Sequence, residues 1–370
     1  MTRLESLYSQ FGQSPWIDNI RRDWLEDGTL ARLVDAGARG VTSNPAIFAK
    51  AFATSDAYDD MIAAAASDDA EAVFEALASA DVRDACDVLA GVHARSREEF
   101  AQGLRRYRDG FVSLEVSPRL ARDTEGTVAA ARRLAAEVAR ANVMIKIPAT
   151  REGLPAITRV LGEGINVNVT LIFSLERYDE VLQAWCAGLE LARANGRDLG
   201  EIASVASFFV SRVDAAMDKM LPLDDDLRGR VANAQVAAAY EIYLGWMASS
   251  RVADLLGANA QVQRPLWAST SPKDPSYDAL LYVDSIVADE TVNTMPDATF
   301  DAAMARGEFA DSLLATPTSR AATAALLDRL SESYSLGEVT SRLEREGVDA
   351  FVTSYEELLA IVAAKLASRS

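Results

Sequence analysis

Short runs of β-forming residues alternate with longer helical patterns along the chain, and this alternation constrains the fold more than any other feature. The eight candidate strands are Pro15–Asn19, Gly40–Asn44, Phe111–Val116, Val143–Ile147, Asn166–Phe173, Ala203–Val210, Pro265–Ser269 and Thr291–Met295. Eight strands that alternate with helices are typical of a closed parallel (β/α)8 barrel, whose chemistry lies at the carboxyl ends of the strands. We therefore predict an α/β protein with a (β/α)8 TIM barrel.

The helical patterns between these strands include Glu26–Ala38, a capped run from Asp123 to Arg140, Leu175–Ala194, and Leu227–Leu256, which we expect to form two helices. A doubly wound open sheet is the alternative fold. It is less favoured because no Gly-x-Gly-x-x-Gly follows an early strand and no Gly-x-x-x-x-Gly-Lys-Ser/Thr occurs.

Helical patterns continue after the eighth candidate strand, over Thr318–Tyr334 and Gly337–Ser370. We interpret them as the last barrel helix and a C-terminal helical extension from about residue 336. The chain has no internal repeat and no long linker, so we expect residues 1–370 to form a single domain.

Composition limits the classes of binding partner and the cellular compartment that we expect. The 55 acidic residues outnumber the 37 basic ones, which disfavours nucleic acid or an anionic membrane as a partner, and an anionic metabolite would need a local basic pocket. Two cysteines, no secretory signal pattern and no apolar run of membrane-spanning length predict a cytoplasmic protein that does not insert in a membrane. The oligomeric state stays open between monomer and homodimer.

A single histidine, His93, limits the chemistry further. Serine triads and histidine-based zinc sites need an imidazole at the reacting centre, and we expect His93 to be a solvated helix residue. The acidic cluster Asp224–Asp226 lacks the ligand spacing of a calcium loop, so we predict neither a metal nor an organic cofactor. Catalysis must then depend on Lys, Asp, Glu, Ser, Thr, Asn or Arg.

Lys146 lies inside the apolar strand pattern Asn142-Val-Met-Ile-Lys-Ile-Pro148. Burial disfavours the charged ammonium form, and a neutral amine can attack a carbonyl carbon to form a Schiff base. A structural ion pair with a core carboxylate is the alternative role.

Polar residues share one face of the strands on either side of Lys146. Period-two alternation places Ser113 with Glu115, and Asn166 with Asn168 and Thr170. Branched apolar side chains usually fill a barrel interior, so polar faces on neighbouring strands indicate a pocket, although an internal hydrogen-bond network would give the same pattern.

Four further polar positions follow strand ends. Asp18 and Asn44 end the first and second strands, where simple capping is the alternative role. Arg212 follows the sixth strand and suits a phosphate, unless it pairs with Asp214 or Asp218 on a helix surface. The loop Trp267–Lys273, which follows the seventh strand, offers hydroxyls and a cation at the usual phosphate end of such barrels.

Five of these segments, taken together, closely resemble transaldolase. They are Gly40-Val-Thr-Ser-Asn-Pro-Ala-Ile-Phe48, Val112-Ser-Leu-Glu-Val-Ser117, Met144-Ile-Lys-Ile-Pro-Ala149, Gly164-Ile-Asn-Val-Asn-Val-Thr-Leu-Ile-Phe173 and Ser207-Phe-Phe-Val-Ser-Arg212. Their order and spacing are similar to those of the longer bacterial transaldolases. The resemblance implies a class I aldolase-like barrel that transfers a dihydroxyacetone unit between phosphorylated sugars in the non-oxidative pentose phosphate pathway.

The resemblance also implies a role for each matching residue. Lys146 would be the Schiff-base lysine, Asp18 an acid/base at the sugar hydroxyl, and Glu115 an acid/base that acts through water near Thr170. The residues that would bind substrate are Asn44, Asn168, Ser207, Phe209, Arg212, Ser269 and Lys273, with Arg212 at the phosphate.

This sequence departs from the family pattern at two places. Many shorter relatives have an arginine soon after the serine of strand seven, where this chain has Ser269 and Lys273, and many have Thr-Thr-Asn-Pro where this chain has Thr-Ser-Asn-Pro. Two alternative functions stay open: a class I fructose 6-phosphate-type aldolase that releases the three-carbon unit, and a non-catalytic barrel that binds sugar phosphates.

Overall fold

The chain forms a closed barrel of eight parallel strands. A computed structural model describes residues 1–368, and its barrel order is β1-β2-β3-β4-β5-β6-β7-β8, with β8 paired to β1. The strands are β1 (Ser14–Ile17), β2 (Gly40–Val41), β3 (Phe111–Glu115), β4 (Val143–Pro148), β5 (Val167–Ile172), β6 (Ser204–Phe209), β7 (Gln263–Ala268) and β8 (Val292–Met295). The predicted (β/α)8 barrel is confirmed, and the open-sheet alternative is wrong.

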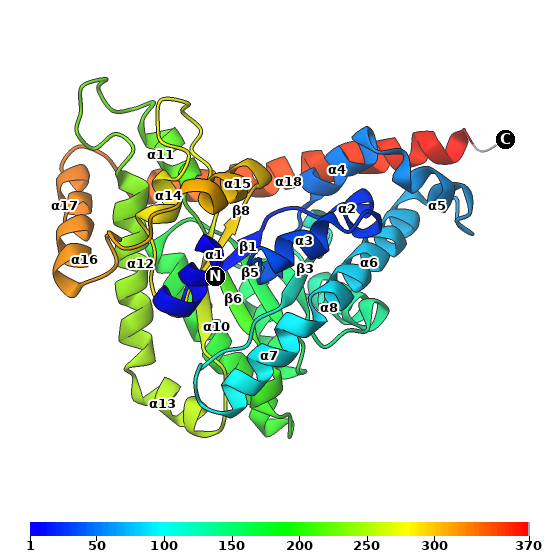
Figure 1. Cartoon of the computed structure of the whole chain (residues 1–370), viewed down its shortest axis with the longest axis horizontal. Coiled ribbons are helices and arrows are strands. Elements are labelled where there is room, and N and C mark those ends of the chain that lie inside the picture. Colours follow the sequence, from blue (N-terminus) through cyan, green and yellow to red (C-terminus); the bar gives the residue numbers. More distant parts are fainter. Residues whose placement is uncertain (369–370) are drawn as a thin grey trace.

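Helices surround this barrel (Figure 1). Those before β5 are α1 (Arg3–Phe11), α2 (Arg22–Glu26), α3 (Thr29–Asp35), α4 (Pro45–Thr54), α5 (Asp59–Ala63), α6 (Ala70–Val88), α7 (Ala90–Ala101), α8 (Thr124–Val138) and α9 (Gly153–Gly162). Those after β5 are α10 (Leu175–Ala194), α11 (Ser211–Met217), α12 (Val231–Met247), α13 (Ser250–Gly257), α14 (Leu281–Asp284), α15 (Asp297–Arg306), α16 (Pro317–Ala324), α17 (Leu326–Ser331) and α18 (Leu336–Ala367). Short 3-10 turns are η1 (Asp56–Tyr58), η2 (Pro118–Leu120) and η3 (Leu199–Glu201). Within the part of the chain described, no helix is long and apolar enough to cross a bilayer.

Capping side chains mark the starts of several helices. The side chain of Asp123 accepts a hydrogen bond from the Gly126 amide at 3.0 Å and begins α8, as its position in the sequence predicts. The predicted single helix Glu26–Ala38 is wrong, because Gly28 has a φ of +77° and separates α2 from α3. The predicted helix Thr318–Tyr334 is likewise divided, into α16 and α17.

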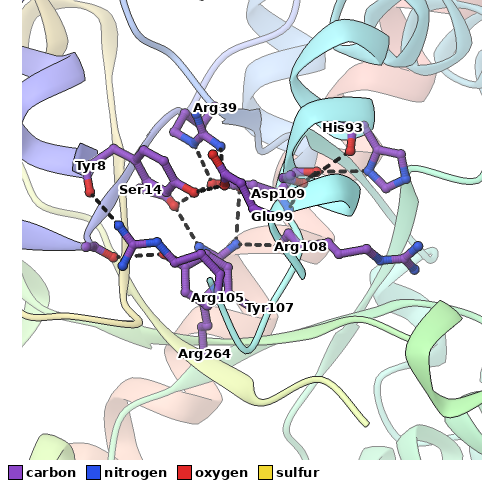
Figure 2. Close-up of polar contacts among 12 residues, drawn as sticks. Tyr8, Ser14, Arg39, His93, Glu99, Arg105, Tyr107, Arg108, Asp109 and Arg264 are labelled. Carbon is purple, nitrogen blue, oxygen red and sulfur yellow. Dashed lines mark hydrogen bonds and ion pairs between the residues drawn. The ribbon is translucent and has the colours of Figure 1, made fainter. Parts of the chain in front are cut away.

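A buried charged cluster closes the amino end of the barrel (Figure 2). We call it the basal cluster; it consists of Ser14, Arg39, Asp109 and Arg264. The Asp109 carboxylate accepts hydrogen bonds from Ser14, from Arg39 Nε at 2.9 Å and from Arg264 Nη2 at 3.2 Å. Every charge in this cluster has an opposite charge beside it.

His93 lies next to the basal cluster and is half-buried, so the prediction of a solvated position is wrong. Its Nδ1 atom is 2.9 Å from the Asp109 carbonyl oxygen, and its ring meets Phe111 edge-on at 5.1 Å. Burial lowers the pKa of this imidazole, although the hydrogen bond with the Asp109 carbonyl opposes the shift.

The last helix, α18, runs across the carboxyl end of the barrel and packs against α4, α6 and α11 (Figure 1). A stripe of buried residues recurs every three or four positions along it, which includes Leu343, Phe351 and Leu358. The helix begins at Leu336, which agrees with the predicted start of the extension. The final positions of the predicted segment Gly337–Ser370 lie outside the described residues.

Candidate functional site

A cavity of about 190 Å³ opens at the carboxyl ends of the strands. Predicted site residues that line it are Asp18, Asn44, Lys146, Thr170, Ser207, Phe209, Arg212, Ser269 and Lys273. Glu115 and Asn168, also predicted, do not line it. Residues that line it without having been predicted are Thr42, Ala46, Ala268, Thr294, Pro296 and Phe351.

Lys146 lies in the middle of this site. Its side chain comes from β4, is 5% exposed and donates a hydrogen bond from Nζ to the Ser43 carbonyl oxygen at 3.0 Å. The parallel register places it between Glu115 of β3 and Asn168 of β5. A lysine amine that is both buried and in contact with a cavity is positioned to attack a carbonyl carbon.

Glu115 is the charged partner of Lys146, at 3.3 Å from Nζ to Oε2. Burial raises the pKa of Glu115 to about 7, even though the Lys146 ammonium opposes this shift. A carboxyl group with a pKa near neutrality can both donate and accept a proton under physiological conditions. The structural ion pair that the sequence left open is therefore present, and it also has the properties of a general acid/base.

Asp18 follows β1 and faces the cavity from the opposite side of the ring of strands. Thr42 Oγ1 donates a hydrogen bond to its Oδ1 atom at 2.6 Å, and the Thr42 and Thr294 hydroxyls are 2.6 Å apart. Burial raises the pKa of Asp18, while Lys146 and Thr42 lower it. Asp18 does not cap the following helix, since α2 begins after Arg21, so the capping alternative is wrong for this residue.

Asn44, in contrast, both caps a helix and contacts the cavity. Its Oδ1 atom accepts a hydrogen bond from the Ile47 amide at 3.0 Å and caps α4, and the residue also lines the cavity. The cap fixes the side chain in one orientation and leaves the amide nitrogen to donate a hydrogen bond to a ligand.

Asn168 is held by its neighbours on both sides. Its Nδ2 donates to Ser113 Oγ at 3.0 Å, and its Oδ1 accepts from Ser207 Oγ at 2.7 Å. The side chain is fully buried and does not reach the cavity in this conformation. The substrate contact predicted for Asn168 stays a prediction, and in this structure Asn168 orients the Ser207 hydroxyl, which does line the cavity. Asn166, at the start of the same polar face, bonds the carbonyls of Ala141 and Val143 instead.

Thr170 lies beside an irregularity in β5. The register between β5 and β6 shifts between Val169 and Ile172, and Leu171 has a φ of +58°. Left-handed backbone is unfavourable for a leucine, and such strain concentrates at functional sites. The Thr170 Oγ1 atom is buried and has no hydrogen-bond partner among the described residues. It is therefore free to bind a water or a substrate hydroxyl.

Two cations border the cavity. Arg212 stands 5.5 Å from the Phe209 ring, and burial lowers the pKa of its guanidinium; Lys273 lies at the rim, where desolvation and Arg212 lower its pKa. The helix-surface pair expected as an alternative is absent among the described residues, because Asp214 instead accepts hydrogen bonds from the Ala232 amide at 2.8 Å and the Tyr282 hydroxyl at 2.7 Å. Among the described residues neither cation forms an ion pair within 4.0 Å, although Glu346 acts on Arg212 and Asp18 acts on Lys273 at longer range. Two neighbouring cations of this kind suit a phosphate.

Ser269 directly follows β7 and has a φ of +57°, and its hydroxyl lies 3.0 Å from that of Ser211. The residue after it, Thr270, is turned away from the cavity and donates to Asn293 Oδ1 at 2.9 Å. Of the hydroxyls in the loop after β7, Ser269 is thus the one that lines the cavity.

The side chains at the cavity that were not predicted include two threonines of the barrel segments and one phenylalanine of the last helix. Thr42 stands within the second-strand segment, where its period-two partner Asn44 was recognised, so alternation could have found it. Thr294 similarly shares one face of β8 with Val292, while Asn293 and Met295 lie on the other face. Phe351 had no local signal, because an apolar residue in an amphipathic helix is typical of ordinary packing.

Residues 15–362 match the family described as Transaldolase/Fructose-6-phosphate aldolase. The chain belongs to this family. Transaldolase 1 of Streptomyces coelicolor is 49% identical over 97% of this chain and 93% of its own length. Transaldolase of Saccharopolyspora erythraea is 48% identical over 99% and 98%. Transaldolase of Thermobifida fusca is 49% identical over 98% of both chains.

Membership in the transaldolase family agrees with the resemblance expected from the five segments. The departure at Ser43 also has a structural explanation. Its Oγ donates to the Ser113 carbonyl at 2.7 Å, and its own carbonyl accepts from Lys146. Both bonds need only a hydroxyl and a backbone carbonyl, so serine serves here as threonine does in many relatives.

Proposed function

We propose that this protein is a transaldolase that uses Lys146 to transfer a dihydroxyacetone unit between phosphorylated sugars. Fructose 6-phosphate and erythrose 4-phosphate would exchange with sedoheptulose 7-phosphate and glyceraldehyde 3-phosphate. The observation that carries this proposal is the contact between a buried lysine and a buried carboxyl group whose pKa is raised to about 7, at a cavity that two cations border. Transaldolase relatives nearly half identical over the whole chain support it.

The first chemical step is attack of the Lys146 amine on the ketose carbonyl carbon. A carbinolamine forms, and its hydroxyl leaves as water when Glu115 supplies a proton, which gives an iminium ion. Glu115 lies 3.3 Å from the nucleophilic nitrogen, so one ordered water at Thr170 is enough to connect the two groups.

The second step breaks the carbon-carbon bond. Asp18 removes the proton of the hydroxyl group on the carbon that becomes the aldehyde of the leaving aldose phosphate. The electrons of the carbon-carbon bond move into the iminium ion. The aldose phosphate leaves, and the three-carbon unit remains on Lys146 as an enamine. The enamine carbon then attacks the carbonyl carbon of an acceptor aldehyde, and the protonated Asp18 returns its proton to the new hydroxyl. Water adds to the iminium carbon that results, which releases the new ketose phosphate and frees Lys146. The raised pKa of Asp18 suits this exchange because it makes the protonated form accessible.

Binding would divide between the two ends of the substrate. Arg212 and Lys273 would hold the phosphate, while Asn44, Ser207 and Ser269 would bind hydroxyl groups and Phe209 would pack beside them. We further propose a single domain of residues 1–370 with α18 as its extension, a cytoplasmic location, and a place in the non-oxidative pentose phosphate pathway. Sedimentation analysis would decide between monomer and homodimer.

The test is release of glyceraldehyde 3-phosphate from fructose 6-phosphate, with and without erythrose 4-phosphate. The wild type, Lys146→Ala and the exposed-lysine control Lys219→Ala would be compared. Release that needs the acceptor, persists in Lys219→Ala and vanishes in Lys146→Ala is the expected result. Acceptor-independent release would identify an aldolase. Binding of fructose 6-phosphate without any release, and without a borohydride-trapped adduct on Lys146, would identify a non-catalytic barrel.

A further inference from the structure

A side chain from the last helix reaches the reacting nitrogen. Phe351 of α18 lines the cavity, is 6% exposed, and its ring centroid lies 5.8 Å from Lys146 Nζ. Of the other residues that line the cavity, Ala46 and Arg212 lie in the first turns of α4 and α11, and the rest come from the barrel strands or the loops that follow them. The C-terminal extension therefore contributes directly to the site and does not only cover the barrel.

Ion pairs hold α18 in place on both sides of Phe351. Glu344 is 3.4 Å from Arg177 of α10, Glu356 is 2.8 Å from Arg119 of η2, and Lys365 pairs with Asp59 of α5. These partners come from segments far apart in the sequence that surround the mouth of the barrel. The helix is thus fastened across the mouth, which fixes the position of the ring.

One glycine lets α18 approach the barrel closely. A Cβ atom at Gly347 would lie 3.2 Å from Leu171 Cδ2 and 3.3 Å from Phe173 Cε2, closer than most side-chain contacts allow. Leu171 belongs to the strained part of β5 that presents Thr170 to the cavity. The close approach of this helix turn brings Phe351, one turn later, over the site.

We propose that Phe351 is a specificity-determining residue that keeps water from the three-carbon adduct on Lys146 and so favours transfer over release. The inference rests on the proposed transaldolase function. Release of dihydroxyacetone needs two additions to the enamine: a proton on its carbon, which regenerates the iminium ion, and a water molecule at the iminium carbon, after which the amine leaves. Transfer needs an acceptor aldehyde in place of that first proton, and the same addition of water then frees the product ketose from Lys146.

Because both routes need the later addition of water, the ring separates them at the first step, where it opposes protonation of the enamine carbon. A water molecule against the ring face loses hydrogen bonds that it would keep in bulk solvent, so the space beside the adduct stays dry. An acceptor aldose phosphate supplies the electrophilic carbonyl carbon, and its phosphate can bind Arg212. Its binding displaces water from the space beside the adduct. The ring therefore acts on the ratio of the two outcomes more than on the formation of the adduct.

The experiment is a graded truncation series, Phe351→Leu, Phe351→Val and Phe351→Ala. For each variant we would measure glyceraldehyde 3-phosphate release from fructose 6-phosphate without acceptor, divided by release with erythrose 4-phosphate. Both rates scale with the amount of folded enzyme, so their ratio is insensitive to a loss of stability. Val348→Ala is the matched control, because Val348 is buried in the same helix one turn earlier and does not line the cavity.

We expect the ratio to rise with each truncation, by about tenfold or more in Phe351→Ala, and to stay within about twofold in Val348→Ala. If Phe351→Ala does not fold, the rise from leucine to valine carries the same test. A ratio that does not change along the series, or that rises equally in Val348→Ala, would overturn the proposal. Failure to trap any borohydride adduct on wild-type Lys146 would instead show that the transaldolase function is wrong.

Discussion

Replacement of Asp109 by asparagine should destabilise the protein strongly without altering the active site. Asp109 is fully buried in the basal cluster, where Arg264 is 1% exposed and Arg39 is 14% exposed. Burial alone would raise the pKa of Asp109, but Arg264, Arg39 and the hydrogen bonds from Ser14 and Trp16 outweigh it and lower the pKa. The carboxylate therefore stays ionised, and its removal leaves one fully buried guanidinium without its counter-charge.

The expected loss follows from that geometry. Removal of one partner from a buried ion pair costs about 3–5 kcal/mol of the free energy of unfolding, a large share of the ~5–15 kcal/mol typical of native proteins. Arg39 retains Glu99 at 4.0 Å, so we place Asp109→Asn toward the lower end of that range. The double variant Asp109→Asn/Arg264→Met removes the stranded charge and should recover about 1 kcal/mol or more relative to additivity.

Urea denaturation followed by tryptophan fluorescence would measure these changes. Trp16 lies beside the basal cluster, since its Nε1 atom donates a hydrogen bond to Asp109 at 2.8 Å. Activity per folded molecule should stay at the wild-type level, because the cavity lies at the other end of the barrel. A single-variant loss below about 1 kcal/mol, or strict additivity in the double variant, would refute the argument that these charges depend on one another.

Three further predictions concern individual groups. Arg212→Ala should raise the KM for fructose 6-phosphate about 10- to 100-fold and leave turnover of unphosphorylated fructose unchanged; an equal loss with both sugars would argue against a phosphate contact. Glu115→Gln should slow borohydride trapping on Lys146 by about 100-fold, whereas Asp18→Asn should trap normally and fail in bond cleavage; the reverse pattern would exchange their roles. Burial raises the pKa of Asp214 from 3.8 to about 6, so its ionisation destabilises the fold above that pH. Asp214→Asn should therefore be more stable than the wild type by up to about 3 kcal/mol at pH 8 and by almost nothing at pH 4. Urea midpoints of the two proteins at the two pH values would measure this difference.

Much of the barrel could be predicted because its strands carry local signals. Each strand is a short run of branched or aromatic residues, and alternation within β3 and β5 was enough to place Glu115 and Thr170 on the inner face. Helix starts were readable where a capping side chain stands at the boundary, as at Asp123. The error at Glu26–Ala38 arose because Gly28 adopts left-handed backbone in a segment whose apolar spacing still looks helical.

For the candidate site, the sequence predicts on which face of its strand each residue lies, but not which side chains contact it. Alternation shows that Asn168 points inward, but not that Ser113 and Ser207 already occupy both ends of its amide. It also cannot show which helix crosses the mouth of the barrel, since that depends on contacts such as Arg177 with Glu344. Phe351 therefore stayed invisible until the packing of the whole chain was known.

Comparison of the two ends of the barrel shows what separates a functional cluster from a structural one. Both ends bury a carboxylate beside a cation, so burial and charge alone do not distinguish them. In the basal cluster four donors surround Asp109, and its pKa is lowered. At the cavity, Glu115 has a raised pKa, and the described residues offer no hydrogen-bond partner to Thr170 Oγ1. Groups that the fold leaves with unused bonding capacity are available to substrate and protons, and groups that the fold satisfies stabilise it.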